Sequence, residues 1–171
     1  MFKLGDIILT ERKSSIIAKF MKFFQKDSVK YSHSMVVIDD SNVIESHIRI
    51  RISPIYDSLK KADSYKIIRK TNITDKELQI LRKSLCSLEG QFYSVKRILL
   101  QILDHIFNTN WFTKQSTDKK DQVCSSLVAW GYYVACKIKF NGVEWASCDP
   151  DDIDDESLNS DKWIIVQEVT K

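Results

Sequence analysis

One stretch of the chain, Gln122-Val123-Cys124-Ser125-Ser126-Leu127-Val128-Ala129-Trp130, places a cysteine at the predicted start of a helix. The residues before it are polar and charged, whereas apolar residues recur at roughly helical spacing between positions 125 and 138. At a helix N-terminus, unpaired N–H groups and the helix dipole lower the pKa of a thiol and so favour the thiolate. The stretch therefore predicts that Cys124 is a nucleophile.

A thiolate enzyme also needs a base, and His33 is the candidate. It stands in the run 31–38, whose apolar and β-branched residues predict a strand that ends at the turn residues 39–42. The next run, 43–48, predicts the returning strand of a hairpin and carries Glu45. A carboxylate at this position can hold the imidazole of His33 while the imidazole accepts the proton of Cys124.

The hairpin also predicts a register. Because side chains alternate between the two faces of a strand, each strand presents one set of residues to the same face. These sets are His33, Met35 and Val37 on the first strand, and Val43, Glu45 and His47 on the second. An odd-length connection brings the two sets together, and an even one separates them. His47, amide groups and water are alternative partners for the imidazole.

These motifs, in this order, resemble the circularly permuted papain-like hydrolases of the NlpC clan, and within it the YiiX/YebB-like group. The resemblance rests on a Ser-His strand, a following Val-Ile-Glu-Ser strand and a late Cys-Ser-x-Leu-Val helix. Three further segments match the family, and they extend the resemblance over nearly the whole chain. They are Gly5-Asp6-Ile7-Ile8-Leu9, Gly90-Gln91-Phe92-Tyr93 and Asp149-Pro150-Asp151-Asp152-Ile153.

The resemblance implies an α+β, permuted papain-like fold. In it, an antiparallel β-sheet or barrel carries the histidine and packs against a helix that opens with the nucleophilic cysteine. The implied catalytic residues are Cys124 as nucleophile, His33 as base and Glu45 as the third polar residue. Tyr31 and Tyr93 are candidate substrate-binding residues of the pocket, although a buried tyrosine hydroxyl commonly just finds a structural partner.

The implied function is that of a cysteine hydrolase that forms an acyl-thioester intermediate. The leading interpretation is an amidase or peptidase acting on small peptide or peptidoglycan-like amides. One alternative is a lipid-directed acyltransferase or esterase of the lecithin:retinol acyltransferase type. Another is a noncatalytic binding module on the same fold.

A basic segment bears on the choice between amide and lipid substrates. Residues 13–25 predict an amphipathic helix with a Phe-rich apolar face, and Lys19, Lys22 and Lys26 fall on one flank. The ordinary interpretation is a helix packed on the core. Peripheral contact with an anionic membrane surface is the alternative, and it would favour a lipid substrate.

Composition excludes several other classes of function. The 171 residues are 43% hydrophobic and 29% charged, which is typical of a globular protein, and we expect a single domain over residues 1–171. With four glycines, the chain has no phosphate-binding glycine-rich loop. Its basic residues are scattered and accompany no RNA-binding aromatic motif or zinc finger, so no nucleic-acid partner is expected.

The cysteines predict a reduced compartment and no bound cofactor or metal. Cys86, Cys124, Cys136 and Cys148 form no CxxC pair and no zinc-ligand spacing with the three histidines. No apolar stretch approaches the roughly 20 residues that span a bilayer, and no signal peptide follows Met1. We therefore expect a cytoplasmic protein.

The remaining patterns complete the predicted element order. Strands are expected at 4–10, 48–52, 65–69 and 163–169, and helices at 74–88 and 94–107, with His105 structural within the second helix. Thr74-Asp75-Lys76-Glu77 has the spacing of a capping box. The acidic segment 149–161 is expected to be a solvated loop.

Overall fold

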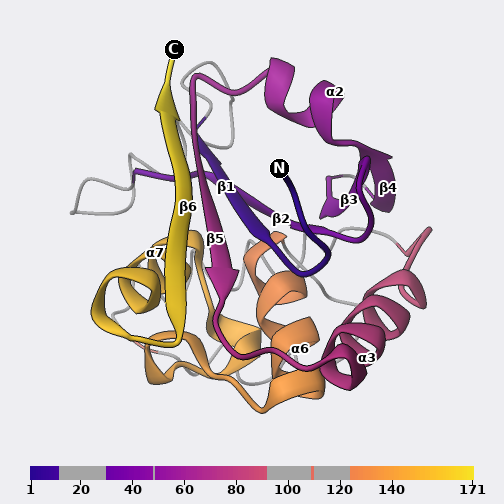
Figure 1. Ribbon diagram of the computed structural model, residues 1–171, viewed down its shortest axis with the longest axis vertical. Helices are drawn as coiled ribbons and strands as arrows, with labels where there is room; N and C mark the ends of the chain where they lie inside the picture. The colour runs from indigo at the N-terminus through magenta and orange to yellow at the C-terminus, as the bar shows by residue number, and fades with distance from the viewer. Residues whose placement is uncertain (12–29, 48, 92–108, 110–123) are drawn as a thin grey trace.

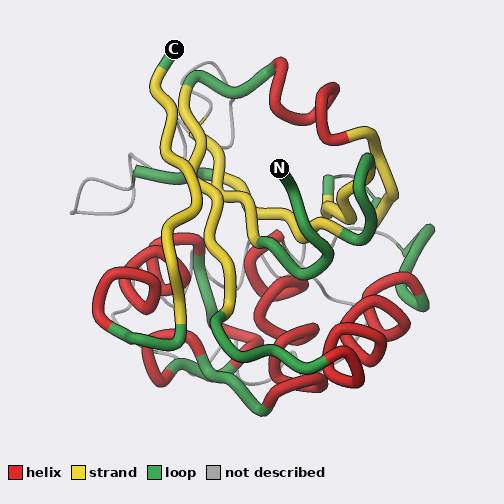
Figure 2. Tube along the Cα trace, in the orientation of Figure 1, coloured by secondary structure: helices red, strands yellow, loops and turns green. Residues whose placement is uncertain are grey.

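The structure, a computed structural model, describes residues 1–11, 30–47, 49–91, 109 and 124–171 (Figures 1 and 2). Six strands and four α-helices are defined within these residues. The strands are β1 (Ile7–Glu11), β2 (His33–Val37), β3 (Asn42–Ser46), β4 (Ile50–Pro54), β5 (Ser64–Lys70) and β6 (Trp163–Thr170). The helices are α2 (Ile55–Lys60), α3 (Asp75–Cys86), α6 (Cys124–Cys136) and α7 (Pro150–Asn159), with short 3-10 turns at Phe140–Gly142 and Trp145–Ser147.

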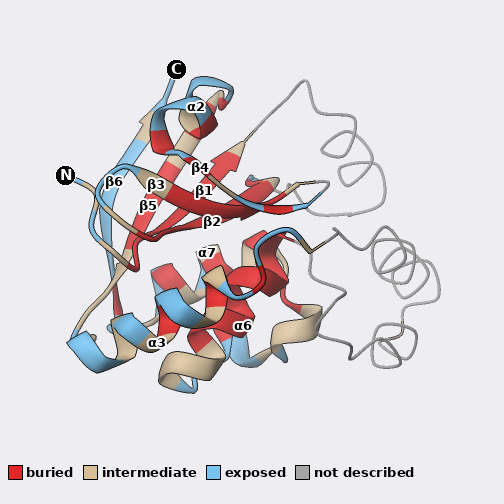
Figure 3. Cartoon of the chain, turned by 90° about the vertical axis from the view of Figure 1, so that its right-hand side faces the viewer, coloured by how far each residue is buried: buried red, intermediate tan, exposed pale blue. Residues whose placement is uncertain are grey.

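The strands form one antiparallel sheet in the order β4-β3-β2-β1-β5-β6. Helices α3, α6 and α7 lie on one side of the sheet, and α2 lies on the other (Figure 3). The protein is therefore of the α+β class, as predicted. β2 lies within the sheet and not at an edge, and its first residue, His33, pairs with Thr10 of β1.

Two apolar clusters hold the layers together, one on each face of the sheet. The larger cluster joins the sheet to α3, α6 and α7 through residues such as Val36, Leu85, Leu127 and Ile153. The smaller cluster, which includes Met35 and Val43, packs against Ile55 of α2. Alternate residues of β2 thus enter different clusters, as the two-residue period of a strand requires. Burial of this apolar surface is the main stabilising contribution to the fold.

Helix α6 is buried along most of its length and packs closely against α3. A Cβ atom placed on Gly131 would lie 2.8 Å from Leu85 Cδ2 and 3.0 Å from Leu81 Cδ1. The missing side chain therefore lets the two helices approach one another. This packing fixes the direction of α6, and with it the position of Cys124 at its first turn.

Most of the predicted elements are present. The expected strands correspond to β1, the β2–β3 hairpin, β4, β5 and β6, and the late apolar helix corresponds to α6. The capping box at α3 is confirmed: Thr74 Oγ1 accepts from the Glu77 N–H at 3.2 Å, and the Glu77 carboxylate accepts from the Thr74 N–H at 2.8 Å. The expected helices at 13–25 and 94–107, with His105, lie outside the described residues.

The prediction of a solvated loop at 149–161 is wrong, because this segment contains α7. Asp149 caps the helix and accepts from the Asp152 N–H at 3.0 Å, while the Asp152 carboxylate accepts from the Asp149 N–H at 3.0 Å. Pro150 occupies the first turn, where its missing N–H has no cost. Ile153 is buried in the larger cluster. The acidic composition obscured a helix that has a reciprocal cap and one apolar anchor.

Neutralising Asp151 by Asp151→Asn is expected to stabilise the protein at pH 8 and to have little effect at pH 4. Burial, with repulsion from Asp149 and Asp154, raises the pKa of Asp151 from 3.8 to about 7. When folding raises the pKa of a carboxyl group, the folded protein becomes less stable as the pH rises from the unfolded-state pKa to the folded-state pKa. The measurement is the melting temperature at both pH values.

The exposed Asp161 provides the matched control for this experiment. Asp161→Asn removes the same charge outside the helix and reports the general effect of net charge on stability. Equal shifts for the two variants at pH 8, or a shift for Asp151→Asn that does not change with pH, would show that repulsion at the start of α7 is not the cause.

Within the described part of the chain, no helix has both the length and the apolar composition needed to cross a membrane.

Candidate active site

Cys124 and His33 are brought together where α6 packs against β2. Cys124 is the first residue of α6 and His33 is the first residue of β2. The thiol and the imidazole are in hydrogen-bond contact, and the backbone N–H groups of Ser34 and Ser125 also donate to the sulfur. Both side chains are nearly enclosed, with relative exposures of 9% for Cys124 and 8% for His33. The sulfur thus lies in the electrostatic setting that stabilises a thiolate.

The hairpin register places Glu45 on the same face as His33. Met35 pairs with Glu45 and Val37 pairs with Val43, so the connection between the paired residues has odd length. The predicted register is confirmed. Glu45 Oε2 lies 3.0 Å from His33 Nε2. Since Nε2 is engaged with the carboxylate, Nδ1 is the ring nitrogen left to face the thiol.

Glu45 is fully buried, and both of its oxygens are occupied by hydrogen-bond donors. Oε2 faces His33 Nε2 and also His47 Nε2, at 3.1 Å. Oε1 accepts from Arg51 Nη2 at 2.9 Å and Nε at 3.2 Å, from Ser53 Oγ at 2.6 Å and from Ser58 Oγ at 3.1 Å. A buried carboxylate is stable only with such partners. They fix its orientation toward the two imidazoles.

The pKa values of the site favour an ion pair between Cys124 and His33. Burial acts to lower the pKa of His33, but hydrogen bonds and attraction from Cys124 and Glu45 outweigh it and raise the pKa to about 9. Burial acts to raise the pKa of Cys124, but the hydrogen bond and charge of His33 outweigh it and lower that pKa. Hydrogen bonds from His33 and His47 likewise overcome burial and hold the pKa of Glu45 well below its usual range. These shifts all act in the same direction, toward a thiolate on Cys124, an imidazolium on His33 and a carboxylate on Glu45.

The other three cysteines do not share this environment. Burial raises the pKa of Cys148 well above its usual value, raises that of Cys136 to about 11, and also raises that of Cys86. Cys148 is fully buried, and its backbone carbonyl accepts from Ser125 Oγ at 2.7 Å. Cys148 is a core residue that supports the first turn of α6.

Sequence reasoning missed the residues that donate hydrogen bonds to Oε1 of Glu45. Arg51 pairs with Glu45 across β3 and β4, so a hairpin register around residue 48 would have indicated it. Ser53 follows two residues later on the same strand face. Ser58 comes from α2, and no local spacing links it to Glu45. Only the packing of α2 against the sheet brings this hydroxyl to the carboxylate.

Of the two predicted substrate-binding tyrosines, the structure describes Tyr31. Tyr31 is fully buried, and its hydroxyl donates to Glu168 Oε1 on β6 at 3.0 Å. Burial raises the pKa of Tyr31 to about 12. In the described structure this tyrosine connects the segment before β2 to β6, and a contact with substrate stays a prediction. Tyr93 lies outside the described residues.

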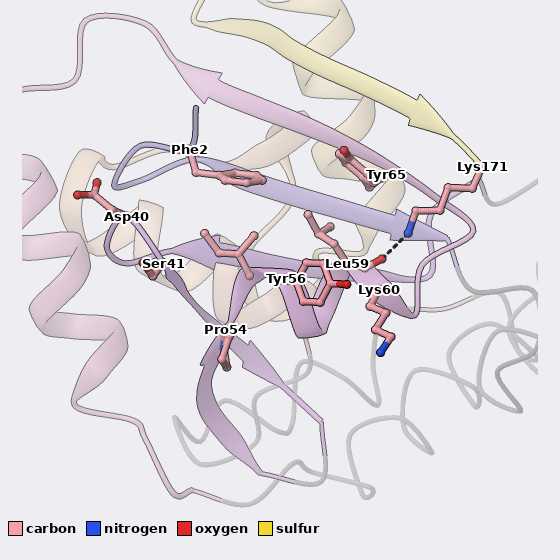
Figure 4. Close-up of a pocket in the computed structure, with 10 residues that line it drawn as sticks. Phe2, Asp40, Ser41, Pro54, Tyr56, Leu59, Lys60, Tyr65 and Lys171 are labelled. Atoms are coloured by element: carbon pink, nitrogen blue, oxygen red, sulfur yellow. Dashed lines mark hydrogen bonds between the residues drawn. The ribbon is translucent and has the colours of Figure 1, made fainter.

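A shallow groove of about 650 Å³ lies elsewhere, beside α2 (Figure 4). Its apolar side chains include Phe2, Tyr56, Leu59 and Tyr65, and Lys171 Nζ donates to the Leu59 carbonyl at 2.8 Å along its border. The lining includes none of the three candidate catalytic residues. The groove therefore adds no support for the site at Cys124.

The fold and the site together define an α+β protein in which one histidine contacts both a cysteine and a glutamate. No family model matches the sequence, and no curated protein is significantly similar to it. Among solved structures, the chain is similar to the metalloprotein YiiX from Escherichia coli O157:H7, with a TM-score of 0.71 and 13% identity. The match covers 99% of this chain and 98% of YiiX. At this identity the similarity shows a YiiX-like fold.

Proposed function

We propose that the protein is a cysteine hydrolase that forms an acyl-thioester on Cys124. The observation that carries the proposal is the chain of contacts from Glu45 through His33 to a thiol at the start of α6. A nucleophile, a base and a group that orients the base, in contact and in this order, constitute the machinery of acyl transfer. His33 is the base and Glu45 is the positioning residue.

The proposed reaction has two steps. The Cys124 thiolate attacks a carbonyl carbon, and the oxyanion is stabilised by the backbone N–H of Cys124 and the positive end of the helix dipole. As the C–N bond breaks, imidazolium His33 gives its proton to the leaving amine. Neutral His33 then takes a proton from a water molecule as the water attacks the thioester. The acid is released, Cys124 leaves as thiolate, and the thiolate–imidazolium pair is restored.

We assign the fold to the permuted papain-like class of the NlpC clan. Support comes from the order of the site residues along the chain, with histidine and glutamate on neighbouring strands before the cysteine helix, and from the YiiX-like fold. For this class, the preferred substrate is a small peptide or peptidoglycan-like amide. Transfer of the acyl group to or from a lipid is the alternative, and it uses the same thioester.

An activated ester tests the proposed intermediate directly. With p-nitrophenyl acetate at pH 6.5, we expect a burst of p-nitrophenolate equal to the enzyme concentration and an acetyl group on Cys124 in the peptide mass spectrum. Cys124→Ala should lose both signals, and Cys86→Ala, the matched control, should retain them. Small peptide amides and lysophospholipid acceptors are then compared for the rate at which the acyl group leaves the enzyme.

The same experiment separates the enzyme from a noncatalytic binding module. Acetylation spread over several cysteines at the rate of a free thiol, or a signal that persists in Cys124→Ala, would reject the proposed nucleophile. In that case the contacts around Glu45 would be structural.

A further inference from the structure

A second histidine lies against Glu45, and the acyl-transfer mechanism does not use it. His47 Nε2 is 3.1 Å from the same carboxylate oxygen, Oε2, that lies 3.0 Å from His33 Nε2. The two imidazole rings have centroids 4.9 Å apart. A base needs only one orienting carboxylate, so the second imidazole calls for another explanation.

The three facing atoms have the spacing of metal ligands. One nitrogen from each histidine and one oxygen of Glu45 all lie within 4.8 Å of one another, and no other group of this kind is found in the described residues. Tetrahedral coordination at about 2.0–2.1 Å separates ligand atoms by about 3.3 Å. The two nitrogen–oxygen distances are shorter by only a few tenths of an ångström, so small side-chain rotations would admit an ion.

The surroundings of Glu45 suit this role. Its Oε1 is held by Ser53, Ser58 and Arg51, which leaves Oε2 as a single, oriented ligand atom. Such contacts behind a ligand orient it and increase metal affinity. The His47 side chain is 32% exposed, whereas the Glu45 side chain is fully buried, so solvent reaches the cluster from the His47 side and can supply a further ligand. The Arg51 cation bonds the other oxygen, Oε1, and its 52% exposed side chain gives water access that weakens its repulsion of a metal ion.

We propose that His33, Glu45 and His47 form a binding site for a divalent transition metal ion, with Zn²⁺ the best match. Two neutral imidazoles and one carboxylate, with an open fourth position, are a ligand set that suits this ion. The site lies at one end of the β2–β3 hairpin, where His33 begins β2 and His47 follows Ser46, the last residue of β3. The two histidines come from separate segments of the chain and form no zinc-ligand motif, which is why the sequence did not indicate the site.

Occupancy would control the proposed enzyme, an effect that rests on the proposed function. An ion bound to His33 Nε2 displaces the proton from that nitrogen and leaves Nδ1 carrying the remaining ring proton toward Cys124. With both nitrogens occupied, the imidazole cannot accept a proton from the thiol or from water. The metal-bound protein would therefore be inactive in acyl transfer, and removal of the metal would restore the base.

Competition with a chromogenic chelator measures the site independently of catalysis. Metal-free protein is titrated with ZnCl₂, and we expect one ion per chain. His47→Gln should weaken binding at least about 100-fold, because it removes a direct ligand, and removal of groups behind a ligand already costs 10–100-fold. His105→Gln, which changes the remaining histidine of the chain, is the matched control and should bind as the wild type does.

Cys124→Ala distinguishes this site from zinc held by the thiolate. It should retain one Zn²⁺, and the Co²⁺-loaded wild type should show no thiolate-to-cobalt charge-transfer band. Loss of binding in Cys124→Ala, or unchanged binding in His47→Gln, would overturn the proposal.

Acetylation of Cys124 is then measured with and without Zn²⁺, and the ratio is compared between the wild type and His47→Gln. We expect Zn²⁺ to suppress the burst in the wild type and a chelator to restore it. Zinc binding without acetylation in the metal-free protein would reject the enzyme and keep the metal site. Acetylation without zinc binding would reject the metal site and keep the enzyme.

Discussion

Replacement of Glu45 by glutamine is expected to lower the free energy of unfolding by about 3 kcal/mol and to abolish the burst of acylation at Cys124. Removing one partner from a buried ionic cluster costs about 3–5 kcal/mol, and glutamine belongs at the low end because it keeps the shape of the side chain. The free energy of unfolding comes from urea titration, and the burst from p-nitrophenyl acetate.

The loss of reactivity follows from the tautomer of His33. In Glu45→Gln, the amide oxygen stays with Arg51 and the two serines, which donate hydrogen bonds to Oε1 in the wild type. The amide nitrogen then faces His33 Nε2 and donates to it. The proton of neutral His33 must move to Nδ1, so that nitrogen can no longer accept the proton of Cys124. In a serine protease triad, a wrong histidine tautomer of this kind lowers kcat by about 10⁴-fold.

The effect on stability should depend on pH in a stated direction. The pKa of His33 is raised from 6.5 to about 9, with Cys124 and Glu45 as the groups that raise it. Charged His33 therefore contributes its stability fully below about pH 6.5 and loses it as the pH rises through about 9. The difference between wild type and Glu45→Gln should be larger at pH 6 than at pH 10.

Glu168→Gln is the matched control for these measurements. Glu168 also accepts a tyrosine hydroxyl and a lysine, but its side chain is 40% exposed and lies on β6. Glu168→Gln should lower the free energy of unfolding by less than about 1 kcal/mol, as loss of an exposed ion pair does, and should leave the acylation burst intact. A Glu45→Gln protein with a full burst would show that the carboxylate does not orient the base.

The rate of Cys124 alkylation in metal-free buffer is expected to rise with pH, with a midpoint well below the ordinary thiol pKa of about 8.5. His33→Ala should move this midpoint to about 8.5 or above. The imidazolium stabilises the thiolate, and without it burial raises the pKa of the thiol. The midpoint is the quantity to measure. Rates at one pH mislead, because a thiolate with a low pKa is also a weaker nucleophile.

Cys86 in the same sample is the internal control, because burial raises its pKa. Mass spectrometry of both peptides reports the two midpoints together. If Cys124 and Cys86 titrate alike in the wild type, or if His33→Ala leaves the Cys124 midpoint low, the ion pair proposed for the site does not exist.

Features set by neighbouring residues could be predicted from the sequence. The capping box at Thr74 and the helical spacing after Cys124 depend on contacts within one or two turns. The register that places Glu45 beside His33 depends on strand alternation and the length of one turn. The same local reasoning failed at α7, because its acidic composition suggested a loop and the burial of Ile153 is not a local property.

The sequence by itself determined which residues could act as nucleophile, base and orienting group, and which strand face carries His33, Glu45 and His47. The tertiary structure decided that Cys124 meets His33, because that contact requires α6 to pack against β2 and against α3 at Gly131. It also decided that Ser58 of α2 reaches Glu45, and that His47 and His33 converge on one oxygen. Local geometry follows from the backbone, whereas contacts between distant segments follow from the burial of apolar faces that the whole chain must satisfy at once.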